Sequence, residues 1–63
     1  MACLAVDSDR TEKIFIDKPV RGDGIWEPAN GNARDFTTMD NGMIEFILGR
    51  NLFWEDKPVE WGE

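Results

Sequence analysis

Carboxylates are the side chains of this chain with the clearest capacity for chemistry, and they occur in two close pairs. Asp7 and Asp9 are separated by one residue, and Glu55 is followed directly by Asp56. A pair of neighbouring carboxylates is a minimal set for acid–base hydrolysis. Asp7 and Asp9 lie among turn-forming residues, however, where aspartate ordinarily accepts hydrogen bonds from nearby backbone N–H groups. A carboxylate-based hydrolase is therefore the weakest of our three functional hypotheses.

The other residue types give little support for catalysis or metal binding. The chain has no histidine, so its single cysteine, Cys3, has no imidazole partner and is expected to be a buried strand residue. A Cys/His zinc site is excluded by the ligand count. The run from Asp7 to Asp9 begins like a calcium loop, but the sixth position would be Glu12 and the twelfth Lys18. No glycine has the spacing of a phosphate-binding loop. We predict no enzymatic activity, no metal, no cofactor and no small-molecule ligand.

Length and composition predict one small domain, residues 1–63, stabilised by a few large side chains. One cysteine permits no intramolecular disulfide, which favours a reducing, cytoplasmic setting. No apolar run has the length of a signal peptide or membrane span. Thirteen acidic and seven basic residues give a net charge of −6. The basic residues are scattered, so direct nucleic-acid binding is not expected.

The N-terminal third predicts a β-hairpin. Two apolar, partly β-branched runs, 3–6 and 13–16, flank a stretch rich in turn formers. In the second run Ile14 and Ile16 point to one face of the strand, and Lys13 and Phe15 point to the other. Pro19 ends this strand or places it at an edge.

Further strands are expected on both sides of the chain's centre. Residues 21–24 predict a turn, and 25–27 a short third strand that is stopped by Pro28. The stretch from Ala29 to Thr38 is small and polar apart from Phe36, and whether it is an ordered weak hairpin or a loop stays open. Residues 51–55 predict a final strand, continued in extended form to Trp61.

One helix, from about Asp40 to Leu48, is the element around which the other segments are expected to pack. On a helical wheel, Met39 and the apolar residues that follow it form one arc about 200° wide, which is more than a single sheet face covers. Asp40 or Asn41 can supply the N-cap oxygen, and Gly49 suits a left-handed C-terminal residue.

The resulting fold class is α+β: a small antiparallel sheet of three to four strands, packed on one short helix. The sheet would contain the N-terminal hairpin, the short third strand and the C-terminal strand, in an order that the sequence does not determine. An identical tetrapeptide, Asp-Lys-Pro-Val, occurs at 17–20 and 56–59. We interpret both copies as the same way of leaving an edge strand rather than as an internal duplication.

The surplus of apolar side chains favours a non-enzymatic module that binds a protein partner or a second copy of itself. The expected interaction surface consists of Ile44, Leu48, Trp54 and Trp61. Trp61 either folds back over the helix, which we favour, or anchors a partner. The alternative hypothesis is an acidic inhibitor that mimics nucleic acid and occupies a basic groove. Its charge would be concentrated at Glu55, Asp56, Glu60 and Glu63.

The order of these pieces also resembles a known group of proteins. The matching pieces are 1–6, 14–15 with 18–20, 26–28, 44–49 and 54–56 with 58–59. They are similar to very short uncharacterised proteins predicted from gut bacteria and their phages. The resemblance implies a phage or mobile-element origin, and it carries over no functional residue.

Overall fold

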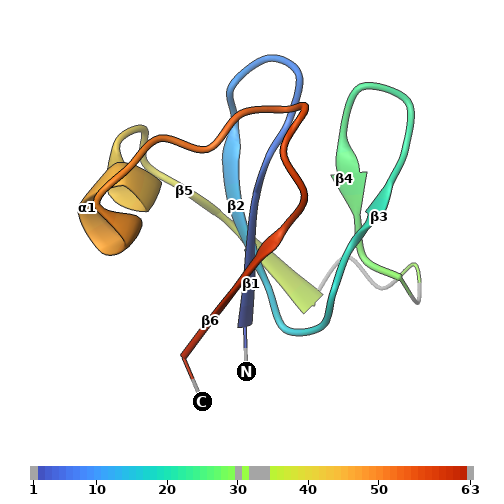
Figure 1. The fold of residues 1–63 in the computed structure, drawn as a ribbon. Helices are drawn as coiled ribbons and strands as arrows, with labels where there is room; N and C mark the ends of the chain where they lie inside the picture. Colours follow the sequence, from blue (N-terminus) through green and yellow to red (C-terminus); the bar gives the residue numbers. More distant parts are fainter. Residues whose placement is uncertain (1, 30, 32–34, 63) are drawn as a thin grey trace.

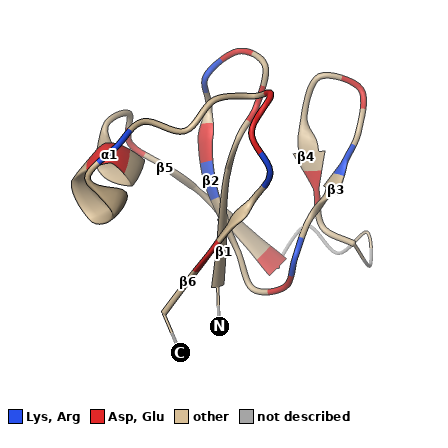
Figure 2. Cartoon of the chain, viewed as in Figure 1, with Lys and Arg blue, Asp and Glu red and all other residues tan. Residues whose placement is uncertain are grey.

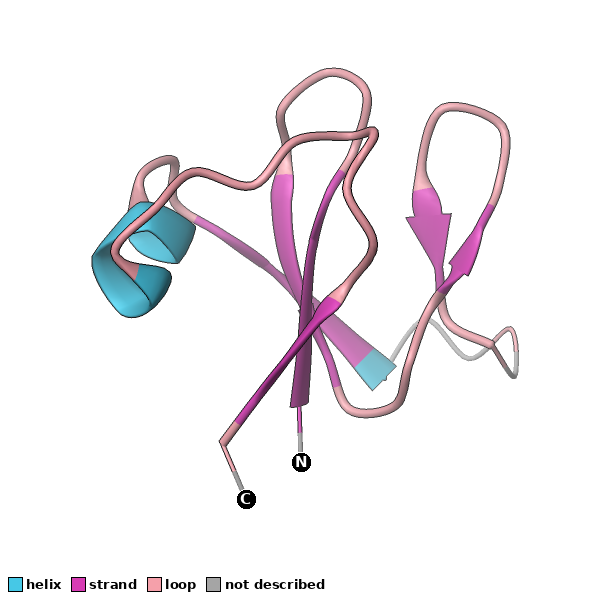
Figure 3. Ribbon diagram, in the orientation of Figure 1, coloured by secondary structure: helices cyan, strands magenta, loops and turns pink. Residues whose placement is uncertain are grey.

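The computed structural model of this chain describes residues 2–29, 31 and 35–62 and confirms a small α+β fold. A four-stranded antiparallel sheet has the order β5-β2-β1-β6, and β3 and β4 form a separate two-stranded hairpin. Figures 1 and 3 show the helix α1 on one side of the sheet and this hairpin on the other. The elements are β1 (Ala2–Val6), β2 (Glu12–Phe15), β3 (Val20–Arg21), β4 (Trp26–Glu27), β5 (Phe36–Met39), α1 (Met43–Leu48) and β6 (Val59–Trp61).

The predicted N-terminal hairpin is confirmed as β1 and β2, with Cys3 opposite Phe15 and Val6 opposite Glu12. Both faces of this central pair are covered, so β1 is apolar along its length instead of alternating with polar residues. The result is a three-layer arrangement of hairpin, sheet and helix. The radius of gyration is 10.4 Å, near the value of about 11 Å typical of a folded chain of this length.

The apolar side chains divide into two clusters, one on each face of the sheet. The helix-side cluster is built on Leu4 and Val6 of β1, with Ile44 and Leu52 packed over them. The hairpin-side cluster is built on Cys3, Ala5 and Phe15, with Trp26 of β4 packed over them; Phe36 and Trp54 border it. Alternation along β1 assigns successive residues to the two clusters.

The helix is shorter than predicted. It begins at Met43, not at Asp40, and Met39 belongs to β5. The expected cap by Asp40 or Asn41 is wrong: the N-cap residue is Gly42, in a left-handed conformation with φ of 96°, and it makes no side-chain cap bond. The C-terminal prediction is confirmed, because Gly49 is left-handed and its N–H donates to Glu45 O.

Two of the predicted strands differ in position or pairing. The third strand exists as β4, but it pairs with β3 and does not extend the main sheet. The final strand is not at residues 51–55; it is β6, which pairs with β1 and places Ala2 opposite Trp61. Leu52 is instead buried in the helix-side cluster.

The segment left open, from Ala29 to Thr38, contains part of a strand that the sequence did not reveal. Its end forms β5, in which Phe36 lies opposite Phe15. Asn30 and residues 32–34 lie outside the described part of the chain.

Both copies of Asp-Lys-Pro-Val end at the first residue of a strand, because Val20 begins β3 and Val59 begins β6. The interpretation that both copies leave an edge strand is wrong, because the first follows β2, an inner strand of the sheet, and the second follows a loop.

Candidate interaction surface

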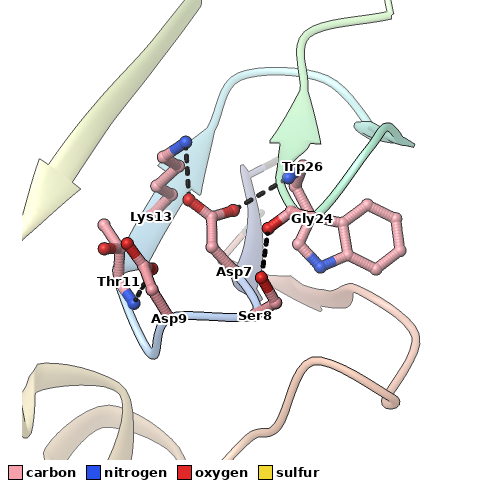
Figure 4. Close-up of polar contacts among 7 residues, drawn as sticks. All are labelled: Asp7, Ser8, Asp9, Thr11, Lys13, Gly24 and Trp26. Atoms are coloured by element: carbon pink, nitrogen blue, oxygen red, sulfur yellow. Dashed lines mark hydrogen bonds and ion pairs between the residues drawn. The ribbon is translucent and has the colours of Figure 1, made fainter.

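Asp7 forms a buried ion pair and a buried hydrogen bond, and it does not pair with Asp9. Its Oδ2 lies 2.8 Å from the Lys13 Nζ, and its Oδ1 accepts the Trp26 backbone N–H at 2.8 Å. Figure 4 shows this carboxylate between β2 and β4, with Asp9 directed to a separate contact. Both Asp7 and Lys13 are buried. The contact joins the turn, the sheet and the hairpin, which indicates a structural role for Asp7.

The other candidate chemical groups also have local partners. Two hydrogen bonds from Thr11 hold the pKa of Asp9 below its ordinary value. The bond from the Thr11 side chain has the larger effect, and the bond from its backbone N–H has the smaller one. Asp56 Oδ2 accepts the Phe53 N–H at 2.9 Å. Burial raises the pKa of the Cys3 thiol, and the charge of Glu60 adds to the rise. Cys3 is thus a buried, protonated strand residue at neutral pH, as expected.

The four residues predicted to form the interaction surface do not lie together. Ile44 is 1% exposed and forms part of the helix-side cluster, so it presents no surface to a partner. Leu48 is half-buried and packs against the same cluster. Trp54 borders the hairpin-side cluster, with its ring centroid 5.7 Å from that of Trp26. Only Trp61 is exposed, at 43%; it lies in β6 and is not part of the helix-side cluster, so the favoured fold-back over the helix is wrong.

Trp61 belongs instead to an apolar row at one end of the sheet. The register places Ala2 opposite Trp61, and one further step from the Cys3–Phe15 pair places Ile16 on the other side of Ala2. These three side chains share the helix side of the sheet by alternation. Ile16 is 59% exposed and Ala2 is partly exposed. The six-residue helix covers the rows of Leu4 and Val6 but leaves this row open.

A hollow of about 200 Å³ lies over the open end of the sheet, and we name it the sheet-end hollow. Four of its lining residues, Ala2, Ile14, Ile16 and Thr37, point to the helix side of the sheet by alternation. Its lining residues are Ala2, Ile14, Phe15, Ile16, Asp35, Phe36 and Thr37. The exposed lining is predominantly apolar, which is typical of a contact surface for another polypeptide.

A second hollow, of about 260 Å³, lies on the opposite face between β4 and β5, and we name it the hairpin-side hollow. The Lys13 ammonium lies 4.9 Å from the Phe36 ring centroid at its floor. Its lining residues are Lys13, Ile25, Trp26, Glu27, Pro28, Gly31 and Phe36. Phe36 lines both hollows, so β5 separates them.

The sequence contained one signal for the open row. Alternation correctly placed Ile14 and Ile16 on the same face of the sheet, which the helix-side cluster and the open row now share. Sequence reasoning missed Ile16 and Ala2 as surface residues because the true start of the helix depends on Gly42 and on a contact from Glu12.

Charge and metal-ligand placement give no competing site in the described part of the chain. Figure 2 shows Asp and Glu distributed over helix, strands and turns, with Lys and Arg between them. Among the described residues, no three Cys, Asp or Glu side chains are grouped to hold a metal ion. No helix formed by these residues is long and apolar enough to cross a membrane. Glu63, one of the four acidic residues assigned to nucleic-acid mimicry, lies outside the described residues.

Comparison with known proteins gave no match: no protein family, no curated protein and no solved structure is significantly similar to this chain. Its function therefore has to be inferred from its own surface.

Proposed function

We propose that this protein is a non-enzymatic interaction module that binds another protein through the open end of its sheet. The observation that carries the proposal is the uncovered row of Ile16, Ala2 and Trp61 beside the sheet-end hollow. The proposed setting is the cytoplasm, which a chain with one buried cysteine suits. A phage or mobile-element origin, implied by the sequence resemblance, is part of the proposal.

The exposure of these side chains supports binding because it has no role in the stability of the monomer. Ile16 and Trp61 are large and apolar, yet 59% and 43% of their surfaces are exposed. Ala2 and Ile16 line the sheet-end hollow, which can receive an apolar side chain of a partner, and Trp61 lies beside Ala2 on the neighbouring strand. Aromatic residues that border such depressions often dominate binding free energies.

Photo-crosslinking tests the proposal directly. A photoreactive phenylalanine analogue is placed at position 61 in the full chain, and a matched protein carries it at position 53. Phe53 is a suitable control because it is also exposed, at 53%, and lies near Val6 and Arg10 at the other end of the sheet. The expected result is a specific crosslink in host lysate from position 61 and none from position 53.

Reconstitution with the purified crosslinked partner decides the matter. We expect Trp61→Ala and Ile16→Thr each to weaken the complex by about tenfold or more, since an apolar anchor contributes at least 1–2 kcal/mol. Phe53→Ala should leave the affinity within about twofold. A complex that is insensitive to both sheet-end substitutions, or failure to form any binary complex, would overturn the proposal.

A further inference from the structure

We propose that the partner contributes an extended segment, which adds as a fifth strand to the free edge of β5 and places alternate side chains in the two hollows. The inference rests on the proposed function and specifies how the sheet end binds.

The outer edge of β5 has backbone groups directed away from the sheet. The Ile16 N–H donates to Asp35 O at 2.9 Å, and the register pairs Phe15 with Phe36. Because hydrogen-bonded and non-hydrogen-bonded pairs alternate in an antiparallel ladder, Thr37 and Met39 direct their backbone groups to β2. Phe36 and Thr38 therefore direct their N–H and C=O groups outward. In the described part of the sheet, β5 is an edge strand.

The opposite edge, β6, is a poorer template. It has three residues, and Pro58 directly before it has no N–H. The Asp7 N–H donates to Thr11 O, so alternation directs Leu4 and Ala2 toward β6 and leaves Glu60 as the outward residue of β6. A short strand, a proline and a charged side chain are features that protect an edge from pairing. The four residues of β5, Phe-Thr-Thr-Met, include no proline and no charged side chain.

The two hollows supply positions for side chains of an added strand. They lie on opposite faces of the sheet and share Phe36 as a lining residue. Successive side chains of a strand point to opposite faces. A segment paired with β5 would thus direct one side chain toward Ile14, Ile16 and Thr37 and the next toward Phe36 and Lys13. Main-chain bonding with alternating side-chain pockets is an established mode of peptide recognition.

An apolar segment of a different protein fits this edge better than a second copy. Each chain carries a net charge of −6, so two copies repel one another. The favoured segment has apolar residues at two successive positions, one for each hollow, and lysine or arginine at its ends.

The test uses octapeptides selected from a random phage-displayed library on the immobilised full-length protein, with the most enriched sequence synthesised as the probe. We expect two adjacent apolar residues in that sequence, one for each hollow. On binding, the Phe36 and Thr38 amides should become protected from hydrogen exchange by about tenfold or more, because their N–H groups gain partners.

A proline substitution separates edge pairing from contact with the apolar row. Thr38→Pro removes an outward N–H and keeps the ladder to β2, so we expect the fold to survive and probe binding to weaken at least about tenfold. Thr38→Val, which keeps the N–H, is the matched control and should bind within about threefold of the wild type. Circular dichroism verifies that both variants are folded; if Thr38→Pro is not, a backbone N-methyl group at Thr38 in synthetic protein replaces it.

Each outcome is decisive. Binding that is lost in Trp61→Ala but unchanged without the Thr38 N–H would overturn strand addition and leave the proposed function intact. Binding that is indifferent to both changes, or a library that enriches no sequence, would contradict both proposals at this edge. A dimer in sedimentation that the loss of the Thr38 N–H abolishes would identify a second copy as the occupant and overturn the proposed one.

Discussion

The Asp7 carboxylate links three elements: it follows β1, pairs with Lys13 of β2 and accepts the backbone N–H of Trp26 in β4. Asp7, which the sequence places among turn-forming residues, therefore connects the sheet to the hairpin. Sequence alternation placed Lys13 on the same face as Phe15, and this was the available signal that a cation is buried. Alternation could not identify Trp26 as the second partner of Asp7, because Trp26 lies 19 residues from Asp7 in the chain.

Replacing Asp7 should be costly, since it leaves the Lys13 ammonium buried without its counter-charge. We expect Asp7→Asn to lower the free energy of unfolding by about 3 kcal/mol, measured by urea denaturation. Asp9→Asn, at an exposed turn position whose amide oxygen can still accept the Thr11 N–H, is the control and should change it by less than about 0.5 kcal/mol.

The Asp7–Lys13 pair also has a double-mutant test. In the Asp7→Asn background, Lys13→Met should recover part of the lost stability, because removing both charges leaves no unpaired ion. Additive losses from the two substitutions would show that the ion pair is not the source of the effect.

At the scale of elements, the helix α1 is too short to be stable by itself and depends on a cap that a strand of the sheet supplies. Glu12 of β2 supplies it: Oε2 accepts the Gly42 N–H at 2.7 Å and Oε1 accepts the Ile44 N–H at 2.8 Å. The sequence predicted that a helix exists and where it ends, because both signals are local. It did not predict where the helix begins, because the capping carboxylate lies 30 residues earlier in the chain.

Loss of this cap should affect the helix more than the sheet. We expect Glu12→Ala to destabilise the protein by about 1–2 kcal/mol, since two charge-assisted hydrogen bonds at the helix N-terminus are lost. Hydrogen exchange of the Phe46 and Gly49 amides, which donate to Gly42 and Glu45, should accelerate. Glu45→Ala, in the exposed first turn, is the control and should cost about 0.5 kcal/mol. Unchanged protection in Glu12→Ala would rule out the cap.

At the scale of the whole molecule, the chain must cover both faces of one sheet with only 63 residues. The fold class and the N-terminal hairpin were predictable, since alternation and turn formers are local. The strand order was not, because β1 pairs with both β2 and β6 and the second pairing joins the two ends of the chain. The row of Ile16, Ala2 and Trp61 is open because the short helix covers only part of the sheet face on which it lies.

Arg21 joins the hairpin to the C-terminal segment that leads into β6. Its Cζ lies 4.7 Å from the Trp26 ring centroid and 4.5 Å from that of Trp54, and one Nη2–H donates to Trp54 O at 2.8 Å. A planar guanidinium can stack on both rings and donate in its own plane, whereas a lysine ammonium cannot. The contact therefore depends on arginine itself and not merely on a positive charge.

We expect Arg21→Met to destabilise the protein by about 1–2 kcal/mol, because the cation and its hydrogen bond are lost, and Arg21→Lys by somewhat less, because lysine keeps the charge but loses the planar stack on both rings. Thermal unfolding measures the loss, and a red shift of tryptophan emission should accompany it as the Trp26–Trp54 contact loosens. Arg50→Met, at an exposed position, is the matched control and should stay within about 0.5 kcal/mol of the wild type. If Arg21→Lys proves as stable as the wild type, charge alone explains the contact and the stacked geometry does not contribute. If Arg21→Met and Arg50→Met lose equal amounts of stability, Arg21 does not stabilise the contact between the hairpin and the C-terminal segment.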